Sequence, residues 1–575
     1  MFACTSIDRF EKVNRQFSAL TDAEIAQDLN FGAAFPNILR AIGINSGGPA
    51  QYAEDWGHDN FMRHTGTPLD EYGGRDHMSW FMIDSWHNYM WNHVYNNIMS
   101  PALAVKKVAE ATDQDLFAAW ADLFMVLGIS RFTLWHGPLV YSEYGQDLTE
   151  FEFDSEKELY ERLFSELDRI IEVFAEYSRL RDGRQNQLHK FDASYNSVTT
   201  TSNTHLLQWL RMMNTLRLRL AMRIVKADDA WAEKEFNKAL SDTNGIILTN
   251  AQNFNTSLLG GTHPFWTMSN NWNDSRMGAG MEEVLVGYKD PRAHVWFNQV
   301  GDFTSGTALN ARQLDSLRTI LTPGREDGWH FKGIAGAAIL SGGKDARIPY
   351  SYISRNFNTS GFLGGHRKIL DAAEVRFILA EAVLRGWNVT NIAPKNSSIS
   401  GMTAKEFYED GVRLSWEENR ATTINGRTVE VYLNDDTSLP IDYVDPKEPR
   451  NSYQTKMTDL RIHTIKWDED LGREEKLEKI MIQKWINSFL HASEMWSDHR
   501  RTGYPKLHDN IKNDSNETWG RIQPGDVLMR FPMVERERLN NPAYASGKIQ
   551  AKIGPQGDKI TQHLWIHPNW GGPNF

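Results

Sequence analysis

The chain has 575 residues, a formal net charge of −12, and ordinary shares of hydrophobic (41%) and charged (24%) residues. This length exceeds an average single domain and allows a large core, in a multidomain, repetitive or unusually large helical protein. Because Lys and Arg are dispersed and the balance is acidic, the composition argues against a nucleic-acid partner.

Cys4 is the only cysteine, and it directly follows a small residue, Ala3. A single cysteine excludes an intrachain disulfide and a Cys-based zinc site. A small residue before Cys is half of a bacterial lipoprotein cleavage motif, without the charged and apolar stretch that should precede it. Cys4 is therefore either the acylated residue of a lipoprotein with its signal peptide trimmed, or an accidental cysteine near a terminus.

Hydrophobic residues at helical spacing dominate the informative segments. They predict helices at about 85–110, 114–134, 156–178, 231–240 and 404–416. The segment from Leu116 to Leu134 is the most apolar, but Asp122 and Arg131 interrupt it, so it is typical of a core helix and not of a membrane span.

Three further segments carry clear helical signals. From Asn203 to Ile224 an apolar stripe predicts a long amphipathic helix, with arginines on its other faces. Asp371 with Glu374 three residues later resembles a helix start, and Gly386 supplies a stop. A last stripe of apolar residues shares one face in the C-terminal third: Leu477, Met481, Trp485 and Phe489.

Neighbouring helices with short links indicate helix hairpins stacked as in tetratricopeptide-like scaffolds, although the repeat consensus is not legible. Between them lie long stretches rich in Gly, Asn, Ser, Asp and Trp, at 43–80, 251–280, 321–365 and 420–465. Loops of this length in a compact protein are usually functional or disordered. The predicted fold class is therefore mostly α, with a helix-hairpin scaffold and long loop-rich insertions.

Motifs for common enzyme chemistry are missing from the sequence: it has no GxxxxGK[ST], HExxH or GxSxG segment. His58 and His64 flank Asp59, but their six-residue spacing does not place both imidazoles on one helical face, which argues against a metal site. Glu374 and Glu381 could imitate the acid/base pair of a glycoside hydrolase. Their apolar surroundings and nearby arginine favour structural ion pairs instead.

Several segments, in order along nearly the whole chain, resemble the SusD/RagB family. They are 209–223 (WLRMMNTLRLRLAMR), 290–292 (DPR), 373–382 (AEVRFILAEA), 483–486 (QKWI), 494–505 (EMWSDHRRTGYP) and 530–532 (RFP) with Glu535 and Asn540. On physical grounds these segments are core and scaffold, with apolar stripes, caps and buried arginine pairs. The ligand surface is therefore expected in the loops.

The resemblance implies a tetratricopeptide-like scaffold with ligand-binding insertions and no catalytic site. It implies that Cys4 is the lipid anchor, with residues 1–10 as tether and 11–575 as one nutrient-binding domain on the outer surface of the outer membrane. The family's usual partner is a SusC-like TonB-dependent transporter, over which the lipoprotein sits as a lid. No cofactor or metal is expected.

A glycan site needs an aromatic platform for the apolar face of a sugar ring, with neighbouring amides or charged groups for the hydroxyls. The densest match is Trp266, Asn270, Asn271 and Trp272, with Trp329, Trp80 and Tyr72 as candidates from other loops. For each residue, packing in a large core is the alternative to ligand contact.

Three functions follow from these observations. The leading hypothesis is capture of an oligosaccharide or polysaccharide and its delivery to the transporter, without bond cleavage. The alternative within the family is uptake of peptides, as in RagB-like proteins, which would favour pairing edges and deeper pockets. A glycoside hydrolase is the third, and it would need two accessible carboxylates at catalytic spacing.

Overall fold

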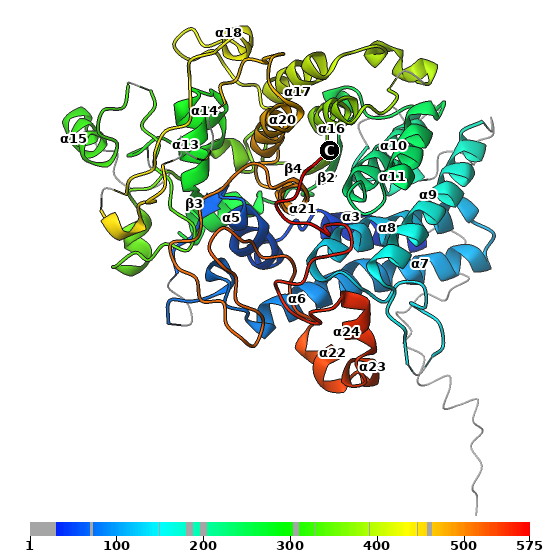
Figure 1. The fold of residues 1–575 in the computed structure, drawn as a ribbon. Coiled ribbons are helices and arrows are strands. Elements are labelled where there is room, and N and C mark those ends of the chain that lie inside the picture. The colour runs from blue at the N-terminus through cyan, green and yellow to red at the C-terminus, as the bar shows by residue number, and fades with distance from the viewer. Residues whose placement is uncertain are drawn as a thin grey trace, which may run out of the picture.

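The computed structural model describes residues 30–69, 73–148, 150–179, 188–195, 204–302, 310–326, 328–389, 392–445, 447–456, 460 and 463–575. The predictions for Cys4, for the tether at 1–10 and for Tyr72 lie outside these residues. The described chain is mainly helical, as predicted, and its helices form one body with α7–α11 at one side and α13–α15 at the other (Figure 1).

The first scaffold unit is a series of helices in which each packs on the next: α7 on α8, α8 on α9, α9 on α10 and α10 on α11. This succession is the predicted stack of helix hairpins. Its members are α7 (Ser100–Ala111), α8 (Asp115–His136), α9 (Glu156–Arg179), α10 (Thr204–Arg223) and α11 (Asp229–Ser241).

The second scaffold unit is built around α16 (Ala372–Arg385), which packs against α17 (Ala404–Glu418), α20 (Arg473–Asn487) and α10. Its two ends are confirmed: the Asp371 side chain accepts a hydrogen bond from the Glu374 amide at 2.8 Å, and Gly386 ends the helix with φ +80°. The helix α20 ends at Asn487, before Phe489, whose ring stacks on Trp296 at 4.8 Å. The last residue of the predicted stripe therefore lies beyond the helix. The helix α21 (Ser493–Thr502) follows and packs on α20 and α10.

The prediction of a helix over 85–110 is confirmed, because the segment is helical without interruption from Asp84 to Ala111. A π-helical turn, η4 (Tyr95–Met99), lies within it between α6 (Asp84–Val94) and α7. Pro101, near the start of α7, has no amide hydrogen to donate and its ring crowds the carbonyl four residues earlier, so the regular hydrogen-bond ladder cannot pass through it.

Short elements occupy the long segments between the scaffold helices. In the N-terminal half they are η1 (Asn30–Ala34), α3 (Phe35–Ile42), α4 (Gly47–Ala50), η2 (Gln51–His58), α5 (Asp59–Phe61), β1 (Thr65–Gly66), η3 (His77–Ser79), η6 (Asn250–Gln252), β2 (Phe254–Ser257), α12 (Pro264–Trp266), η7 (Thr267–Asn271) and β3 (Arg276–Met277). Further along they are α13 (Ala279–Gly287), α14 (Arg292–Trp296), α15 (Ala311–Leu321), η8 (Gly343–Arg347), η9 (Arg355–Phe357), β4 (His366–Leu370), η10 (Pro394–Ile399), α18 (Val429–Leu433), η11 (Pro449–Asn451), α22 (Glu535–Asn540), α23 (Pro542–Ala545) and α24 (Lys548–Ile553).

The described strands form two antiparallel pairs that tie distant segments together. β1 pairs with β3, with Thr65 opposite Met277, and β2 pairs with β4, with Phe254 opposite Leu370. The first pair joins the segment after α5 to the segment after η7. It thereby fixes the position of the Trp-rich segment relative to the N-terminal part of the chain.

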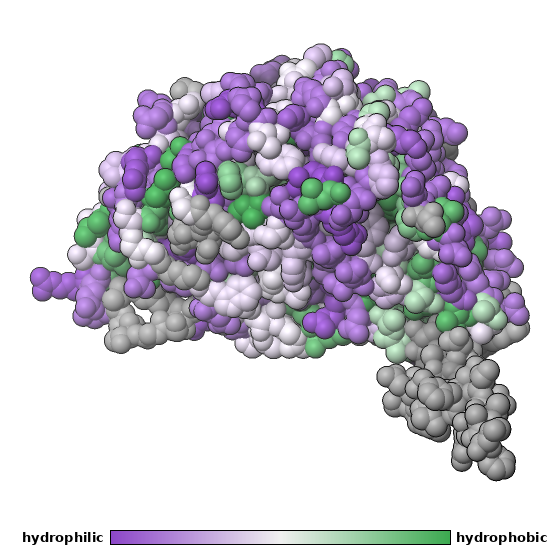
Figure 2. Space-filling model, turned by 90° about the horizontal axis from the view of Figure 1, so that it is seen from below, coloured by the Kyte–Doolittle hydropathy of each residue, from purple (hydrophilic) through white to green (hydrophobic). Residues whose placement is uncertain are grey.

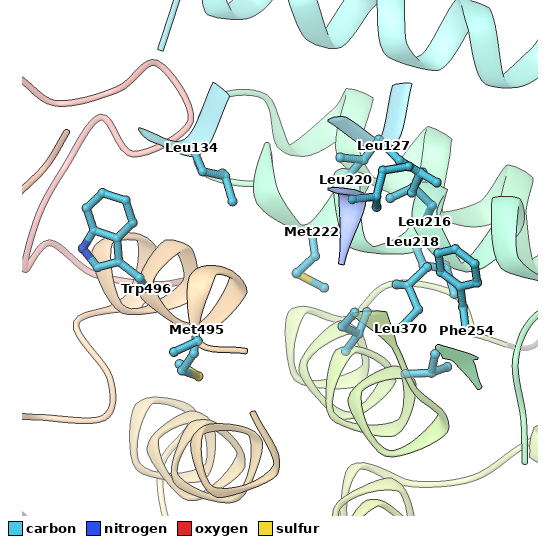
Figure 3. Close-up of a cluster of buried hydrophobic side chains, with 14 of the residues drawn as sticks. Leu127, Leu134, Leu216, Leu218, Leu220, Met222, Phe254, Leu370, Met495 and Trp496 are labelled. Atoms are coloured by element: carbon cyan, nitrogen blue, oxygen red, sulfur yellow. The ribbon is translucent and has the colours of Figure 1, made fainter. Parts of the chain in front are cut away.

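The main hydrophobic core lies between α8, α10, α21 and the β2–β4 pair (Figure 3). Leucines of α10 meet Leu127 of α8 on one side and Phe254 and Leu370 of the strand pair on the other. Among the described residues α8 alone has the length and hydropathy of a membrane span, and 94% of its most apolar window is buried inside the fold. The prediction of a core helix here is confirmed.

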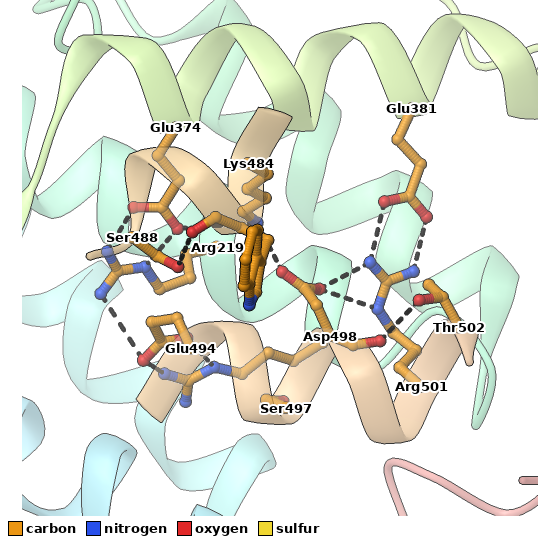
Figure 4. A network of polar contacts seen from close by, with 12 residues as sticks. Arg219, Glu374, Glu381, Lys484, Ser488, Glu494, Ser497, Asp498, Arg501 and Thr502 are labelled. Carbon is orange, nitrogen blue, oxygen red and sulfur yellow. Dashed lines mark hydrogen bonds and ion pairs between the residues drawn. The ribbon is translucent and has the colours of Figure 1, made fainter. Parts of the chain in front are cut away.

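Arg217, Arg219 and Arg223 of α10 are buried and Arg211 is partly covered, so this helix is enclosed on nearly all faces and is not amphipathic in the simple sense expected. Arg219 binds Glu374 of α16, and Arg223 binds Glu494 of α21 (Figure 4). Buried guanidinium groups need such partners, because an unpaired buried charge costs several kcal/mol. The charged face of α10 is therefore an internal contact surface of the scaffold.

Candidate ligand-binding surface

The predicted Trp-rich segment runs through α12 and the turn η7. Trp266 is half-buried at the end of α12, Asn271 is exposed, and Trp272 keeps 38% of its surface exposed. The Asn270 amide donates to the carbonyls of Trp266 at 3.3 Å and Ile353 at 3.0 Å. Asn270 thus holds the turn in place, and Trp272 is the residue of this segment that offers a ring to solvent.

Two of the other predicted aromatic residues are buried. Trp329 is 3% exposed and its ring meets His294 at 5.1 Å. Trp80 is 7% exposed and lines a partly open pocket of about 220 Å³ together with Trp496 and Trp570. Neither residue presents a ring next to Trp272. Their role in ligand binding stays a prediction, and the burial of both rings does not support it.

Trp272 lies directly over the backbone of α4. A Cβ atom placed on Gly47 would come within 2.4 Å of the Trp272 Cη2 atom, so the glycine is what allows the indole to sit there. A Cβ on the next residue, Gly48, would lie 3.2 Å from the hydroxyl oxygen of Tyr89. Two consecutive glycines therefore bring the rings of Trp272 and Tyr89 to the same small stretch of backbone.

Tyr89 and Tyr52 extend this surface. Tyr89 is 44% exposed, and its ring lies 5.1 Å from the half-buried ring of Tyr52. Below them Trp56 and Trp86 stack at 4.4 Å, and Trp86 is buried. We name these three residues, Trp272, Tyr89 and Tyr52, the aromatic platform. Its two tyrosines rest on the stacked rings of Trp56 and Trp86.

Hydrogen bonds between α4–η2 and the turn after η7 hold the two halves of the platform together. The Gln51 amide donates to Asp274 at 3.0 Å, and Asp274 is paired with Arg347 at 3.0 Å. Beneath them the Ser275 hydroxyl donates to Asp55 at 2.6 Å. Burial raises the pKa of Asp55 to about 7, although the hydrogen bond from Ser275 works in the opposite direction.

Tyr52 and Tyr89 were missed by the sequence analysis, and a signal for Tyr89 was present. In α6 the buried residues include Trp86, Met90 and Val94, whereas Ser85 and Asn92 are exposed. Tyr89 falls on the polar side of this pattern, where an aromatic residue has no packing role to explain it. Tyr52 lies in a π-helical segment without a regular period, so spacing carried no such signal.

The carboxylates considered for glycoside hydrolysis are closed off by cations (Figure 4). Glu374 is paired with Arg219 and lies 3.8 Å from the Lys484 amine. Glu381 receives two hydrogen bonds from Arg501, one of them 2.8 Å long. Burial opposes ionisation of Glu381, but Arg501 and Arg385 together outweigh it and keep the pKa of this carboxyl below its usual value. Both groups are structural ion-pair partners, as the sequence favoured.

His58 and His64 also belong to the interior. The His58 ring lies between Trp135 and Trp496, 4.9 Å from each, and His64 contacts Asp59 at 3.3 Å and the Trp485 carbonyl oxygen at 2.9 Å. Within the described part of the chain no three His, Cys, Asp or Glu residues are grouped so that they could hold a metal ion.

The helix-hairpin scaffold and the solvent-facing rings of the platform define a helical protein that displays aromatic residues on α6 and on segments between its helices. Such a surface offers aromatic faces for stacking and amides for hydrogen bonds. The chain belongs to the SusD-like family, described as Susd and RagB outer membrane lipoproteins, whose model matches residues 12–567.

Solved structures agree with this assignment. A chitin-binding SusD homologue from Flavobacterium johnsoniae is 28% identical, with a TM-score of 0.79 over 95% of this chain and 100% of that chain. A SusD homologue from Bacteroides uniformis is 26% identical (TM-score 0.74; 94% and 99% covered), and one from Bacteroides thetaiotaomicron is 25% identical (TM-score 0.74; 94% and 99% covered). The comparison with curated proteins finds no match.

Proposed function

We propose that this protein captures a glycan at the aromatic platform and acts as a binding protein without chemistry of its own. The observation that carries the proposal is the exposed pair Trp272 and Tyr89, set side by side by Gly47 and Gly48. Their faces can cover the C–H face of successive sugar rings. The exposed amide of Asn271 lies next to Trp272 in the chain and can serve the ring hydroxyls.

Chitin is the first glycan to test, because the Flavobacterium johnsoniae homologue is described as chitin-binding and aligns over nearly the whole chain. Chitin is an uncharged polymer of N-acetylated sugars. An uncharged ligand suits a platform of uncharged rings, and Arg347, which holds the turn after η7, is already paired with Asp274. Stacking and hydrogen bonds to hydroxyl and acetamido groups would then supply the affinity.

The same proposal includes the attachment of the protein and its partner. Family membership supports an outer-membrane lipoprotein. We assign the lipid to Cys4, with residues 1–10 as tether, residues 11–575 as a single binding domain, and a SusC-like TonB-dependent transporter as the acceptor of the captured glycan. Replacing Cys4 by Ser in cells should move the protein from the membrane fraction to the soluble fraction; retention in the membrane would remove the assignment.

The test of ligand binding is electrophoresis of the purified protein through gels that contain chitin derivatives or other polysaccharides. The wild-type protein should be retarded by one polysaccharide class, and Trp272→Ala combined with Tyr89→Ala should abolish the retardation without changing the melting curve. Ile320→Ala removes an apolar side chain that is 61% exposed on α15, and serves as the control. Retardation that survives the double substitution, or binding of a peptide mixture in place of any glycan, would contradict the proposal.

A further inference from the structure

A second surface with aromatic residues lies on the other side of α6. Tyr89 of the platform and Trp91 are two positions apart, and at 3.6 residues per turn such side chains point to nearly opposite sides of a helix. Trp91 faces a groove of about 660 Å³, which lies between the end of α6, residues 140–145 and 150–151, and α22–α23. This volume is within the ~300–1,000 Å³ range of small-molecule sites.

One wall of the groove carries three rings in succession. Trp91 and Tyr95 are 5.1 Å apart, and Tyr95 and Tyr144 are 5.7 Å apart. The Tyr95 hydroxyl donates to the Val140 carbonyl at 3.1 Å, which fixes this ring. The loop that carries Tyr144 is held against α7, because Gly145 packs closely on Leu103. The wall is therefore preformed, and each ring-to-ring step is comparable to the length of one pyranose unit.

The opposite wall is polar and comes from α22 and α23. Glu537 accepts a hydrogen bond from the Asn541 amide at 2.8 Å. The exposed amides of Asn540 and, across the groove, Asn96 have no hydrogen-bond partner within the described part of the chain. These amides can donate to and accept from a ligand, and one such group on each side of a groove lined by rings matches the needs of a polyhydroxylated chain.

The charges in the groove are mixed and do not favour an ionic ligand. Glu150 and Glu537 contribute two carboxylates, against one cation, Arg536. Figure 2 views the molecule from the side on which α22–α24 lie, and the hydrophobic residues of that face form small groups among hydrophilic ones. A stable protein interface would bury a broader apolar centre, so the lining favours a small neutral ligand.

We propose that this groove is a second glycan-binding subsite, which takes another stretch of the same class of chain as the platform. The inference rests on the proposed function. Because α6 carries residues of both surfaces, a long polysaccharide that binds both should be held much more tightly than a short oligosaccharide that reaches only one. Linking two weak sites in this way raises overall affinity without any new contact.

The experiment counts the molecules of a short oligosaccharide bound at saturation, by equilibrium dialysis of the full chain against a labelled trimer of β-1,4-linked N-acetylglucosamine. The wild-type protein should bind two trimers. Trp272→Ala combined with Tyr89→Ala should leave one, and Tyr144→Ala with Asn540→Ala should also leave one while lowering affinity for the soluble polymer about tenfold or more. Trp91 is 3% exposed and is left unchanged, because its removal would damage the core.

If Tyr144→Ala does not fold, the pair Asn96→Ala and Asn540→Ala tests the same groove through two exposed side chains. A count of one that Trp272→Ala combined with Tyr89→Ala abolishes and the groove substitutions do not change would overturn the inference and leave the proposed function standing. A count of zero would remove the inference and chitin as the proposed ligand. If the groove substitutions weaken only the association with a protein, the groove is a protein-docking site and the inference is wrong.

Discussion

The contact of Trp272 with Gly47 allows the platform to be perturbed without removing a ring. In Gly47→Ala the new Cβ would lie 2.4 Å from the indole, nearer than the 3.0 Å limit that real Cβ contacts respect, so the Trp272 ring must move. The free energy of unfolding should change by less than about 1 kcal/mol, since Ala is favoured over Gly in a helix by roughly 0.5–1 kcal/mol. The stacking lost from a ligand is worth roughly 0.5–1.5 kcal/mol, or about a two- to tenfold weaker Kd.

The assay is a calorimetric titration with the glycan found in the gel screen, beside thermal melts. Gly365→Ala is the control, since it introduces a methyl group into open space, and it should bind within about twofold of wild type. Trp272→Ala should match Gly47→Ala, and the double variant should lose little more, because both changes remove one contact. Full affinity in Gly47→Ala would refute the reasoning.

Three further predictions concern the interior. Glu381→Gln leaves Arg501 without its main carboxylate and should lower the free energy of unfolding by roughly 3–5 kcal/mol in urea titrations; a loss below about 1 kcal/mol would contradict the ion-pair account. Burial raises the pKa of Asp55 from 3.8 to about 7, so its contribution to stability is fully present below about pH 4 and is lost as pH rises to about 7. In Asp55→Asn the free energy of unfolding should therefore rise by up to roughly 4 kcal/mol at pH 8 and change little at pH 4. Equal shifts of the melting temperature at both pH values would exclude this account. Gly411→Val, whose Cβ would lie 2.7 Å from the Phe377 ring between α16 and α17, should cost roughly 1–3 kcal/mol by overpacking, and an unchanged melting temperature would contradict it.

The scaffold was readable from the sequence because long helices carry a repeated signal. Asp371 and Gly386 marked both ends of α16, and the apolar segment from 114 was recognised as a core helix. The predicted C-terminal stripe overran its helix, because α20 ends at Asn487, before Phe489. Spacing alone does not show that Arg219 is buried, but the segment 209–223 was expected to hold buried arginine pairs, and the structure places Arg219 against a carboxylate 155 residues away.

The platform was only partly predictable, because its members come from distant segments. The composition of the Trp-rich segment indicated Trp272, but the same argument applied to Trp266 and Trp329, which are largely covered. Whether a ring in an irregular segment is exposed depends on what packs over it. The Trp272 ring packs on Gly47, which lies 225 positions earlier in the chain. A contact between residues so far apart leaves no local pattern in the sequence.

The separation of scaffold and platform has a physical basis. The ion pairs of Figure 4 join α10, α16, α20 and α21, while the platform lies on η2, α6 and the turn after η7. A change to the Trp272 ring touches none of those buried charges, so it carries no desolvation penalty and little cost in stability. A change to Glu381 leaves buried cations unpaired and lowers the free energy of unfolding. The residues that revealed the family are therefore those that the fold requires, and the residues proposed to select the ligand are those that it can vary.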